Sequence, residues 1–174
     1  MISNLYTNPA SAAPSDQAAL EAATKTIDMA AYALNDPPII AALAVAAANG
    51  VQVRLYLDRN ELADMVRNNP AMLQAKYGTL LTSPNIAIKV KASRVLMHLK
   101  SYLVDSAKLR TGSANFTTGG EEPQDNDALW TDDAACIAYF QSKFTAMWNR
   151  PDNLSPQIAV QQSTSYRARV NRSH

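Results

Sequence analysis

The sequence predicts one α/β domain with a mixed, largely parallel central β-sheet flanked by helices. Residues 27–57 read as strand, helix and strand over about thirty residues, which is typical of a βαβ unit with parallel strands. Residues 51–57 and 85–92 alternate apolar and polar side chains, as half-buried strands do. Residues 133–148 repeat apolar side chains at the spacing of one helical face. Together these patterns indicate helices packed against a sheet.

Length and composition narrow the class of protein. The chain has 174 residues, of which 47% are hydrophobic and 18% are charged, and its net charge is +1. These values are ordinary for a globular domain, so any affinity for a polyanion must come from a local patch. Cys136 is the single cysteine, which excludes an intrachain disulfide and a Cys-based metal site. No apolar run approaches the roughly 20 residues that a membrane span requires.

The first elements follow from caps and apolar runs. Residues 1–18 are expected to be a loose lead-in, within which Asp16 is a candidate N-cap of a short helix. Residues 27–34 then read as a buried strand. Asp36 precedes two prolines and is expected to open an alanine-rich helix that ends at Asn49.

The second half of the chain is expected to hold a strand pair and a final helix. Residues 61–77 read as an interrupted helix, and residues 97–105 and 108–112 read as two strands joined by a turn. Asp132 or Asp133 is expected to cap the last helix. The expected division of the chain is a lead-in at 1–18, one folded domain at 19–150 and a flexible, polar and basic tail at 151–174.

A group of candidate catalytic side chains lies in the stretch MHLKSYLVDSAKLRTGSANF. Because side chains alternate along a strand, His98 and Lys100 are expected to share one face, about 7 Å apart. A neutral imidazole is a nucleophile, and an ammonium stabilises the negative charge of a phosphodiester. Gly112 allows a close backbone approach to substrate, while Ser113 and Asn115 supply hydrogen-bond donors for phosphate oxygens.

The combined pattern, H-x-K-x4-D followed by GSANF, resembles the HKD signature of the phospholipase D superfamily. The likeness extends over roughly residues 21–150 and is carried by AATKTIDMAAYAL, IIAALAVAAANGVQVRLYLD, MHLKSYLVD, TGSANFTTGG and QDNDALW. In order and length the chain is similar to the small single-motif bacterial endonucleases of that superfamily. The resemblance implies the superfamily's fold and a phosphodiesterase activity.

The resemblance also implies a mechanism. His98 would attack phosphorus and form a phosphohistidine, while a second histidine would protonate the leaving oxygen and later activate water. Lys100 and Asn115, helped by Ser113, would hold the phosphoryl oxygens. Asp105 completes the signature, although a carboxylate in such a turn is also expected to organise the local backbone.

A carboxylate after GSANF would orient the imidazole, as the acid of a catalytic triad does. Asp125 and Asp127 compete for this role; Asp127 is the better candidate if ALW is a strand, which leaves Asp125 for contacts with substrate. Glu121 and Glu122 are expected to lie in a solvated loop. No EF-hand spacing occurs here and no His or Cys lies nearby, so the reaction is expected to need no metal and no cofactor.

The histidine count gives an independent argument about assembly. The chain has two histidines, His98 and His174, and His174 ends the expected flexible tail. A reaction with one histidine as nucleophile and another as acid therefore requires a second chain. We call residues 97–116 the HKD segment, and we expect a homodimer in which the HKD segments of two chains meet across a twofold axis. The single-motif endonucleases are similar in being homodimers with one composite site.

Basic residues near the HKD segment bear on the substrate. Lys89, Lys91 and Arg94 come shortly before Lys100, and Arg59 follows the end of a strand. They are expected to contact the phosphates of DNA, with RNA as a further candidate, without reading its sequence. For Lys89 and Lys91 an equally good interpretation is protection of a sheet edge against pairing.

Two other functions stay open, and so does the compartment. A lipid phosphodiesterase would use the same chemistry, but no membrane-docking segment is evident, so no stable membrane association is expected. A nucleic-acid-binding module without turnover would have no need of the nucleophile His98.

The N-terminus shows no signal peptide, yet a mature form restarted at Met1 would look the same. Members of this size are often exported, which favours the periplasm or the exterior.

Overall fold

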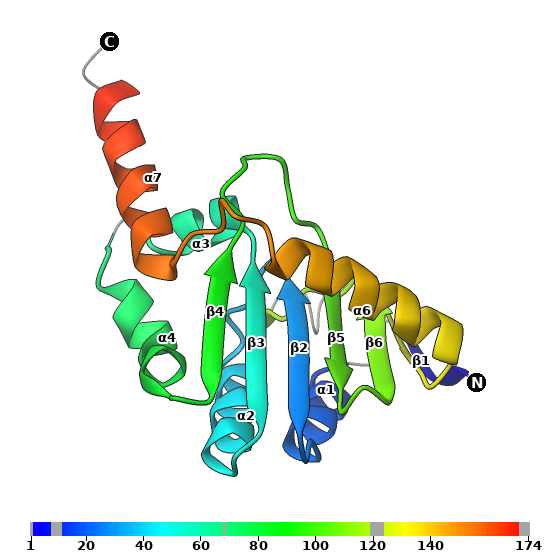
Figure 1. Ribbon diagram of the computed structural model, residues 1–174. Helices are drawn as coiled ribbons and strands as arrows, with labels where there is room; N and C mark the ends of the chain where they lie inside the picture. The colour runs from blue at the N-terminus through cyan, green and yellow to red at the C-terminus, as the bar shows by residue number, and fades with distance from the viewer. Residues whose placement is uncertain (1, 8–11, 68, 119–123, 171–174) are drawn as a thin grey trace.

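The structure, a computed structural model, describes residues 2–7, 12–67, 69–118 and 124–170, and it describes side chains for 12–67, 69–118 and 124–163. The strands are β1 (Ile2–Thr7), β2 (Thr26–Ala31), β3 (Gln52–Leu57), β4 (Ile86–Val90), β5 (Lys100–Val104), β6 (Lys108–Gly112) and β7 (Asp127–Thr131). The helices are α1 (Ala13–Glu21), α2 (Pro37–Ala48), α3 (Arg59–Met65), α4 (Met72–Thr82), α6 (Ala134–Trp148) and α7 (Pro156–Val170). Figure 1 shows one sheet with helices on both faces.

The described strands form one mixed sheet in the order β1-β7-β6-β5-β2-β3-β4. The predicted α/β sheet flanked by helices is confirmed, and its βαβ unit is β2–α2–β3. The parallel part is smaller than the sequence predicts, because four of the six described pairings are antiparallel. The short turn between β5 and β6 accounts for part of this, since a tight turn joins antiparallel strands.

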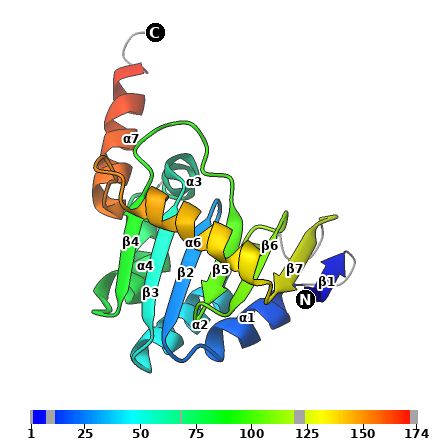
Figure 2. The ribbon, with the colours of Figure 1, turned by 45° about the vertical axis from the view of Figure 1, so that its right-hand side comes forward.

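The sheet is buried between two helical layers. α1, α2 and α4 cover one face, where Leu43 of α2 is fully buried. α6 crosses the other face diagonally (Figure 2). The Asp133 carboxylate accepts a hydrogen bond from the Cys136 N–H at 2.9 Å and so caps the start of α6. The buried positions of this helix are the predicted ones, Ile137, Phe140, Phe144 and Met147.

The N-terminal residues hold more regular structure than the sequence predicts. Residues 2–7 of the expected lead-in form the edge strand β1, which pairs with β7. α1 begins at Ala13, so Asp16 lies inside the helix and is not its N-cap. Asp16 is fully buried and accepts hydrogen bonds from the Arg110 guanidinium at 2.9 Å and the Tyr102 hydroxyl at 2.8 Å. This buried acid attaches α1 to the sheet.

The expected flexible tail also contains a helix. Residues 156–170 form α7, whose Ala159 and Val160 are buried. α7 lies beside α3, and the Arg59 guanidinium donates to Gln162 Oε1 at 3.1 Å. The sequence of this helix is too polar to show an apolar stripe, so its periodicity did not reveal it. Residues 171–174, including His174, lie outside the described part.

The strand ends that flank the HKD segment lie at one edge of the sheet. The carboxyl ends of β2, β3, β4 and β6 lie at this edge together with the amino ends of β5 and β7. In Figure 1 it is the upper edge, over which the connection from β4 to β5 arches. Polar side chains that directly precede or follow these strands therefore meet in one place.

Candidate active site

Lys100 is the first residue of β5 and is almost fully buried. Its ammonium Nζ donates to the backbone oxygen of His98 at 3.0 Å and lies 4.4 Å from the centroid of the Tyr32 ring. Burial lowers the pKa of the Lys100 ammonium to about 8, while the Glu61 and Asp58 carboxylates partly oppose that fall. The site therefore holds a cation with little access to water.

His98 lies just before β5, and its side chain is exposed. The sequence predicts a strand over residues 97–105, but in the structure this strand begins at Lys100. His98 therefore lies outside the strand, and alternation along it does not set the direction of the imidazole. Instead the His98 ring packs edge-on against the Tyr32 ring, with 4.5 Å between the centroids and 62° between the planes. His98 and Lys100 are thus brought together by contact with one tyrosine ring, not by a shared strand face.

Asp58 anchors the segment that leads to His98. The Asp58 carboxylate accepts from the Met97 N–H at 2.7 Å with one oxygen. Its other oxygen accepts from the N–H groups of Asn60 and Glu61, which makes Asp58 the N-cap of α3. One buried carboxylate thus fixes both α3 and the backbone next to His98.

Gly112 and Ser113 join the ends of β6 and β7. Gly112 has a φ of 154°, and a Cβ at this position would lie 2.1 Å from the Asp127 backbone oxygen. The Ser113 N–H donates to that same oxygen at 2.9 Å, and the Ser113 Oγ accepts from the Asp127 N–H at 2.9 Å. Gly112 is thus needed for close packing of the protein's own backbone, whereas the sequence reading assigned it to substrate. The Ser113 hydroxyl keeps its proton for donation to a ligand.

Asn115 is held at the same edge by its two neighbours. The Ala114 backbone oxygen accepts from the Arg110 guanidinium at 3.0 Å, and Phe116 exchanges backbone hydrogen bonds with Ala33 and Asn35. The first contact attaches the loop to β6, and the second attaches it to the residues that follow β2. The Asn115 side-chain oxygen is buried and has no hydrogen-bond partner among the described residues. Because an amide oxygen can only accept, contact with a phosphate oxygen would come from the Asn115 side-chain N–H groups.

The two candidate orienting acids lie at the entrance of β7. Asp127 is the first residue of β7 and Asp125 precedes it, and both side chains are exposed. Within the described part of this single chain, neither carboxylate contacts His98, so the choice between them stays a prediction. Glu121 and Glu122 lie outside the described residues. Elsewhere in the described residues no three His, Cys, Asp or Glu side chains are grouped to hold a metal ion.

Asp105 is not brought to the site. It lies beyond the far end of β5, about 16 Å along the strand from Lys100 at the rise of an extended chain. Its carboxylate accepts four hydrogen bonds, from the Thr24 N–H and hydroxyl and from the N–H groups of Lys25 and Thr26. The structure thus favours the local role for Asp105 over the catalytic one.

The basic residues proposed for substrate contacts divide into two kinds. The Lys89 ammonium donates to the Trp148 backbone oxygen at 2.9 Å and lies over the Trp148 ring, so it serves the packing of α6. Lys91 donates to the Leu96 backbone oxygen at 3.3 Å, and Arg59 donates to the Ala92 backbone oxygen at 2.7 Å. These two shape the loop before His98.

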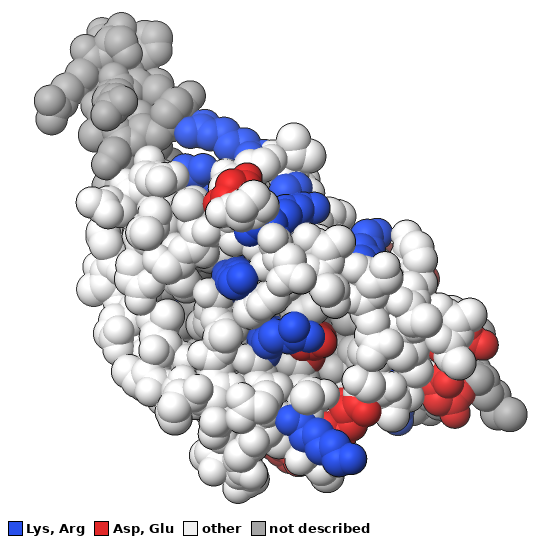
Figure 3. Space-filling model, viewed as in Figure 1, with Lys and Arg blue, Asp and Glu red and all other residues white. Residues whose placement is uncertain are grey.

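Arg94 is different, because its side chain is exposed at the rim of that loop. It is the best placed of the four basic residues for contact with an incoming phosphate. Figure 3 shows the Lys and Arg side chains of the α6 face as separate groups, with no single continuous basic patch. That distribution agrees with the near-neutral net charge of +1.

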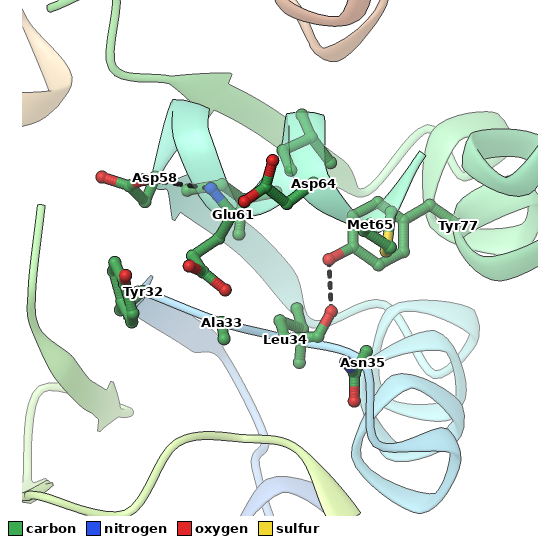
Figure 4. A pocket seen from close by; sticks show the side chains of 11 residues that line it. Tyr32, Ala33, Leu34, Asn35, Asp58, Glu61, Asp64, Met65 and Tyr77 are labelled. Atoms are coloured by element: carbon green, nitrogen blue, oxygen red, sulfur yellow. Dashed lines mark hydrogen bonds between the residues drawn. The ribbon is translucent and has the colours of Figure 1, made fainter. Parts of the chain in front are cut away.

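The sequence reading missed three residues that the structure places beside the HKD segment, namely Tyr32, Asp58 and Glu61. They line a small cavity of about 80 Å³ together with Asp64 and Tyr77 (Figure 4). A signal was available, because Tyr32 and Asp58 directly follow the strands β2 and β3. Polar residues at the carboxyl ends of parallel strands often form the site of an α/β protein.

Comparisons with known proteins agree with this geometry. The family described as cardiolipin synthase, PLD-like domain, matches residues 17–148. A phospholipase D of Rickettsia typhi is 32% identical over 146 residues, which are 83% of this chain and 67% of that protein. A mitochondrial cardiolipin hydrolase of Xenopus tropicalis is 25% identical over 133 residues, which are 76% of this chain and 59% of that protein.

Two solved structures share the fold over nearly their whole length. Nuc from Salmonella typhimurium, described as a phospholipase D family member, superposes with a TM-score of 0.73 at 24% identity, over 88% of this chain and 97% of that one. NucT from Helicobacter pylori gives a TM-score of 0.73 at 20% identity, over 89% of this chain and 99% of that one. At these identities the likeness establishes the fold.

The fold and the HKD segment define a phosphodiesterase of the phospholipase D type. The chain belongs to the phospholipase D superfamily, as the match over residues 17–148 establishes. The relatives differ in what their names say they act on, so the identity of the phosphodiester is a separate question.

Proposed function

We propose that this protein hydrolyses the phosphodiester backbone of DNA, with RNA as a further candidate, through a phosphohistidine and without a metal ion. The observation that carries the proposal is the meeting of the His98 imidazole and the Lys100 ammonium on one Tyr32 ring. Attack on an anionic phosphodiester requires a nucleophile and a nearby cation, and both groups contact this one ring.

The chemical steps follow from these groups. The His98 nitrogen attacks phosphorus, so that an N–P bond forms while the bond from phosphorus to the leaving oxygen breaks. A second histidine gives its proton to that leaving oxygen. It then takes a proton from water, whose oxygen attacks phosphorus and releases His98. Lys100 and Asn115 hold the non-bridging oxygens during both steps, helped by the hydroxyl of Ser113.

The second histidine comes from a second copy of the chain in this proposal. His98 is exposed, and the residues just before it include the apolar Val95 and Leu96, which are 74% and 47% exposed. Burial of such side chains against another copy would remove apolar surface from water. The His98 of the partner subunit would then reach the same phosphate, which gives a homodimer with one composite site.

Nucleic acid is the substrate that the surroundings of the site support best. Arg94 lies exposed at the rim, where phosphate contacts that ignore sequence would hold an extended backbone. None of the described helices has both the length and the apolar character needed to cross a bilayer.

A lipid phosphodiesterase is the second candidate. The curated relatives named phospholipase D and cardiolipin hydrolase favour it, and so do the exposed Val95 and Leu96 beside the site. Exposed apolar side chains at a site rim are also suited to contact with a lipid surface. The same nucleophile and the same cation would serve both substrates.

One experiment separates these candidates. Plasmid DNA, a single-stranded oligonucleotide and vesicles of phosphatidylcholine or cardiolipin are each incubated with the wild-type protein in excess EDTA. His98→Ala is the matched control. Cleavage of DNA that survives EDTA and is lost in His98→Ala supports the proposal. Turnover of lipid alone moves the same mechanism to the second candidate, and DNA cleavage that needs a metal or persists in His98→Ala contradicts the mechanism.

A further inference from the structure

We propose that Tyr32 is a positioning residue that sets His98 and Lys100 in one fixed arrangement, and that the Glu61 carboxylate, which lines the same cavity, tunes the charge of Lys100. This inference rests on the proposed function, because it assigns a role towards the nucleophile and the phosphate-binding cation of that site. It adds two residues from outside the HKD segment to the machinery of the reaction.

The Tyr32 ring contacts both reacting groups. The His98 imidazole meets it edge-on with 4.5 Å between the ring centroids, and the Lys100 ammonium lies 4.4 Å from its centroid. An edge-to-face aromatic pair and a cation over a ring are both directional attractions. A single rigid ring therefore fixes the relation between two side chains that would otherwise move separately.

The backbone of Tyr32 is locked beside the HKD segment. Ala31 pairs with Lys100 in the antiparallel register of β2 and β5, and the Tyr32 N–H donates to the Leu99 backbone oxygen at 2.7 Å. Leu99 is the residue between the histidine and the lysine. Tyr32 therefore cannot shift relative to either of them without breaking the end of the sheet.

Glu61 lines the same small cavity as Tyr32. The Glu61 carboxylate, together with burial and the nearby charges of Asp58 and Asp64, raises the pKa of the Tyr32 hydroxyl to about 12. Figure 4 shows the Glu61 carboxylate and Tyr32 on the same side of the cavity. Glu61 is itself fixed, because its N–H is capped by Asp58 in the first turn of α3.

A purely structural role explains Tyr32 less well. The tyrosine belongs to none of the hydrophobic clusters of the described residues and is only partly buried. Tyr77 offers a contrast in the same cavity, because it is a member of the main cluster and its hydroxyl donates to the Leu34 backbone oxygen at 2.5 Å. The position of Tyr32 is therefore suited to ordering polar groups, while that of Tyr77 is suited to packing.

The acids around Tyr32 also act on Lys100. Its ammonium faces Glu61 and Asp58 from the α3 side, and the Arg110 guanidinium bonds to the Lys100 backbone oxygen from β6. The Glu61 charge opposes the fall in pKa that burial causes. If that charge is removed, the pKa of Lys100 falls further and the ammonium is lost at a lower pH. The alkaline limb of the activity profile then moves to lower pH.

The test uses the full-length protein and bis(p-nitrophenyl) phosphate, a small diester that avoids the choice between nucleic acid and lipid. Tyr32→Leu is expected to lower kcat by about 100-fold with a small change in KM, as a misplaced nucleophile does. Tyr32→Phe keeps the ring and is expected to lose about 10-fold. Glu61→Gln is expected to shift the alkaline limb of kcat to lower pH. Tyr139→Leu on α6 is the matched control, and it should leave kcat unchanged.

An NMR measurement tests the contact itself even if the protein turns over no diester. With labelled histidine the protein gives imidazole signals from His98 and His174 alone, which His98→Ala assigns. Loss of the Tyr32 ring-current shift from the His98 signals in Tyr32→Leu supports the proposal. Unchanged His98 signals, or a kcat within about 2-fold of wild type in a folded Tyr32→Leu dimer, would overturn it. Thermal unfolding confirms that each variant is folded.

Discussion

Gly112 controls how closely the loop with Ser113 and Asn115 approaches β7. A Cβ at Gly112 would lie 2.1 Å from the Asp127 backbone oxygen, so Gly112→Ala must separate the two strands. We expect the free energy of unfolding to fall by about 1–3 kcal/mol, and we expect a loss of activity as well. Thermal or urea unfolding measures the first, and a diester assay measures the second.

Gly50 provides the control for that substitution. It also has a positive φ, 91°, but a Cβ there would meet no atom within 4 Å. Gly50→Ala is therefore expected to cost about 1 kcal/mol from backbone strain alone and to leave activity intact. Equal effects of the two substitutions on stability and on activity would contradict the role given to Gly112.

Asp105 gives a prediction about pH. Burial raises the pKa of its carboxyl group, but the hydrogen bonds from Thr26, Thr24 and Lys25 outweigh this, so the pKa lies below its usual value. The stability that these bonds contribute is complete above the usual pKa of about 3.9 and is lost as the pH falls through the folded-state value. Asp105→Ala should lower the free energy of unfolding by about 1–3 kcal/mol at pH 7 and by less at pH 3.

Activity distinguishes this role of Asp105 from a catalytic one. At a temperature where the variant is folded, Asp105→Ala should keep a kcat close to that of wild type. A large loss of kcat in a folded variant, with no change in stability, would restore the catalytic assignment that the HKD signature suggests. Circular dichroism at both pH values provides the stability measurement.

At the scale of elements, α1 is attached to the sheet by the ion pair of Asp16 and Arg110, and both side chains are fully buried. Removing one partner would leave a buried charge without its counter-ion, so Asp16→Ala should destabilise the protein by about 3–5 kcal/mol. Arg110 also donates to the backbone oxygens of Lys100 and Ala114, so activity should fall as well. Denaturant unfolding is the measurement.

A second ion pair, between the neighbouring strands β2 and β3, serves as the comparison. Asp28 and Arg54 bond at 2.6 Å, but their side chains are 15% and 40% exposed. Water screens such a pair, so Asp28→Ala should cost at most about 1 kcal/mol. If Asp28→Ala proved as destabilising as Asp16→Ala, burial would not be what makes the Asp16 pair important.

These elements also show what the sequence could reveal. The strands and α6 were predictable because alternation and helical spacing are local patterns, and His98, Lys100 and Asn115 stand in one short motif. β1 was not predictable, because its residues become a strand through pairing with β7 at the other end of the chain. Asp16 resembles a helix cap in the sequence for the same reason. Its true partner, Arg110, lies far away in the sequence, so no local pattern reveals the ion pair.

The site was predictable to a similar degree. The motif singles out His98 and Lys100, but it contains no information about the residues that contact them. Tyr32 and Glu61 come from other segments and lie near the HKD segment only because β2 and β3 end at the edge of the sheet where β5 begins. Asp105 shows the converse, since it belongs to the motif but lies at the opposite end of β5.

At the scale of the whole molecule, the composite site predicts that two copies share one reaction. A heterodimer of wild-type and His98→Ala chains, purified through two different tags, should have almost no activity because its single site lacks one histidine. Independent sites would instead leave about half of the wild-type activity. Light scattering should give the mass of a dimer for wild type, for the variant and for the heterodimer.

The central claim is that His98 becomes covalently bonded to phosphorus during turnover, and trapping that bond tests it most directly. The protein is mixed with a phosphorus-labelled diester in excess EDTA, quenched in base within one turnover, and digested for mass spectrometry. We predict that His98 carries phosphorus together with the ester group that did not leave, that acid releases this adduct, and that it is absent from His98→Ala. Product formation by wild type with no adduct, or with the adduct on another residue, would contradict the account.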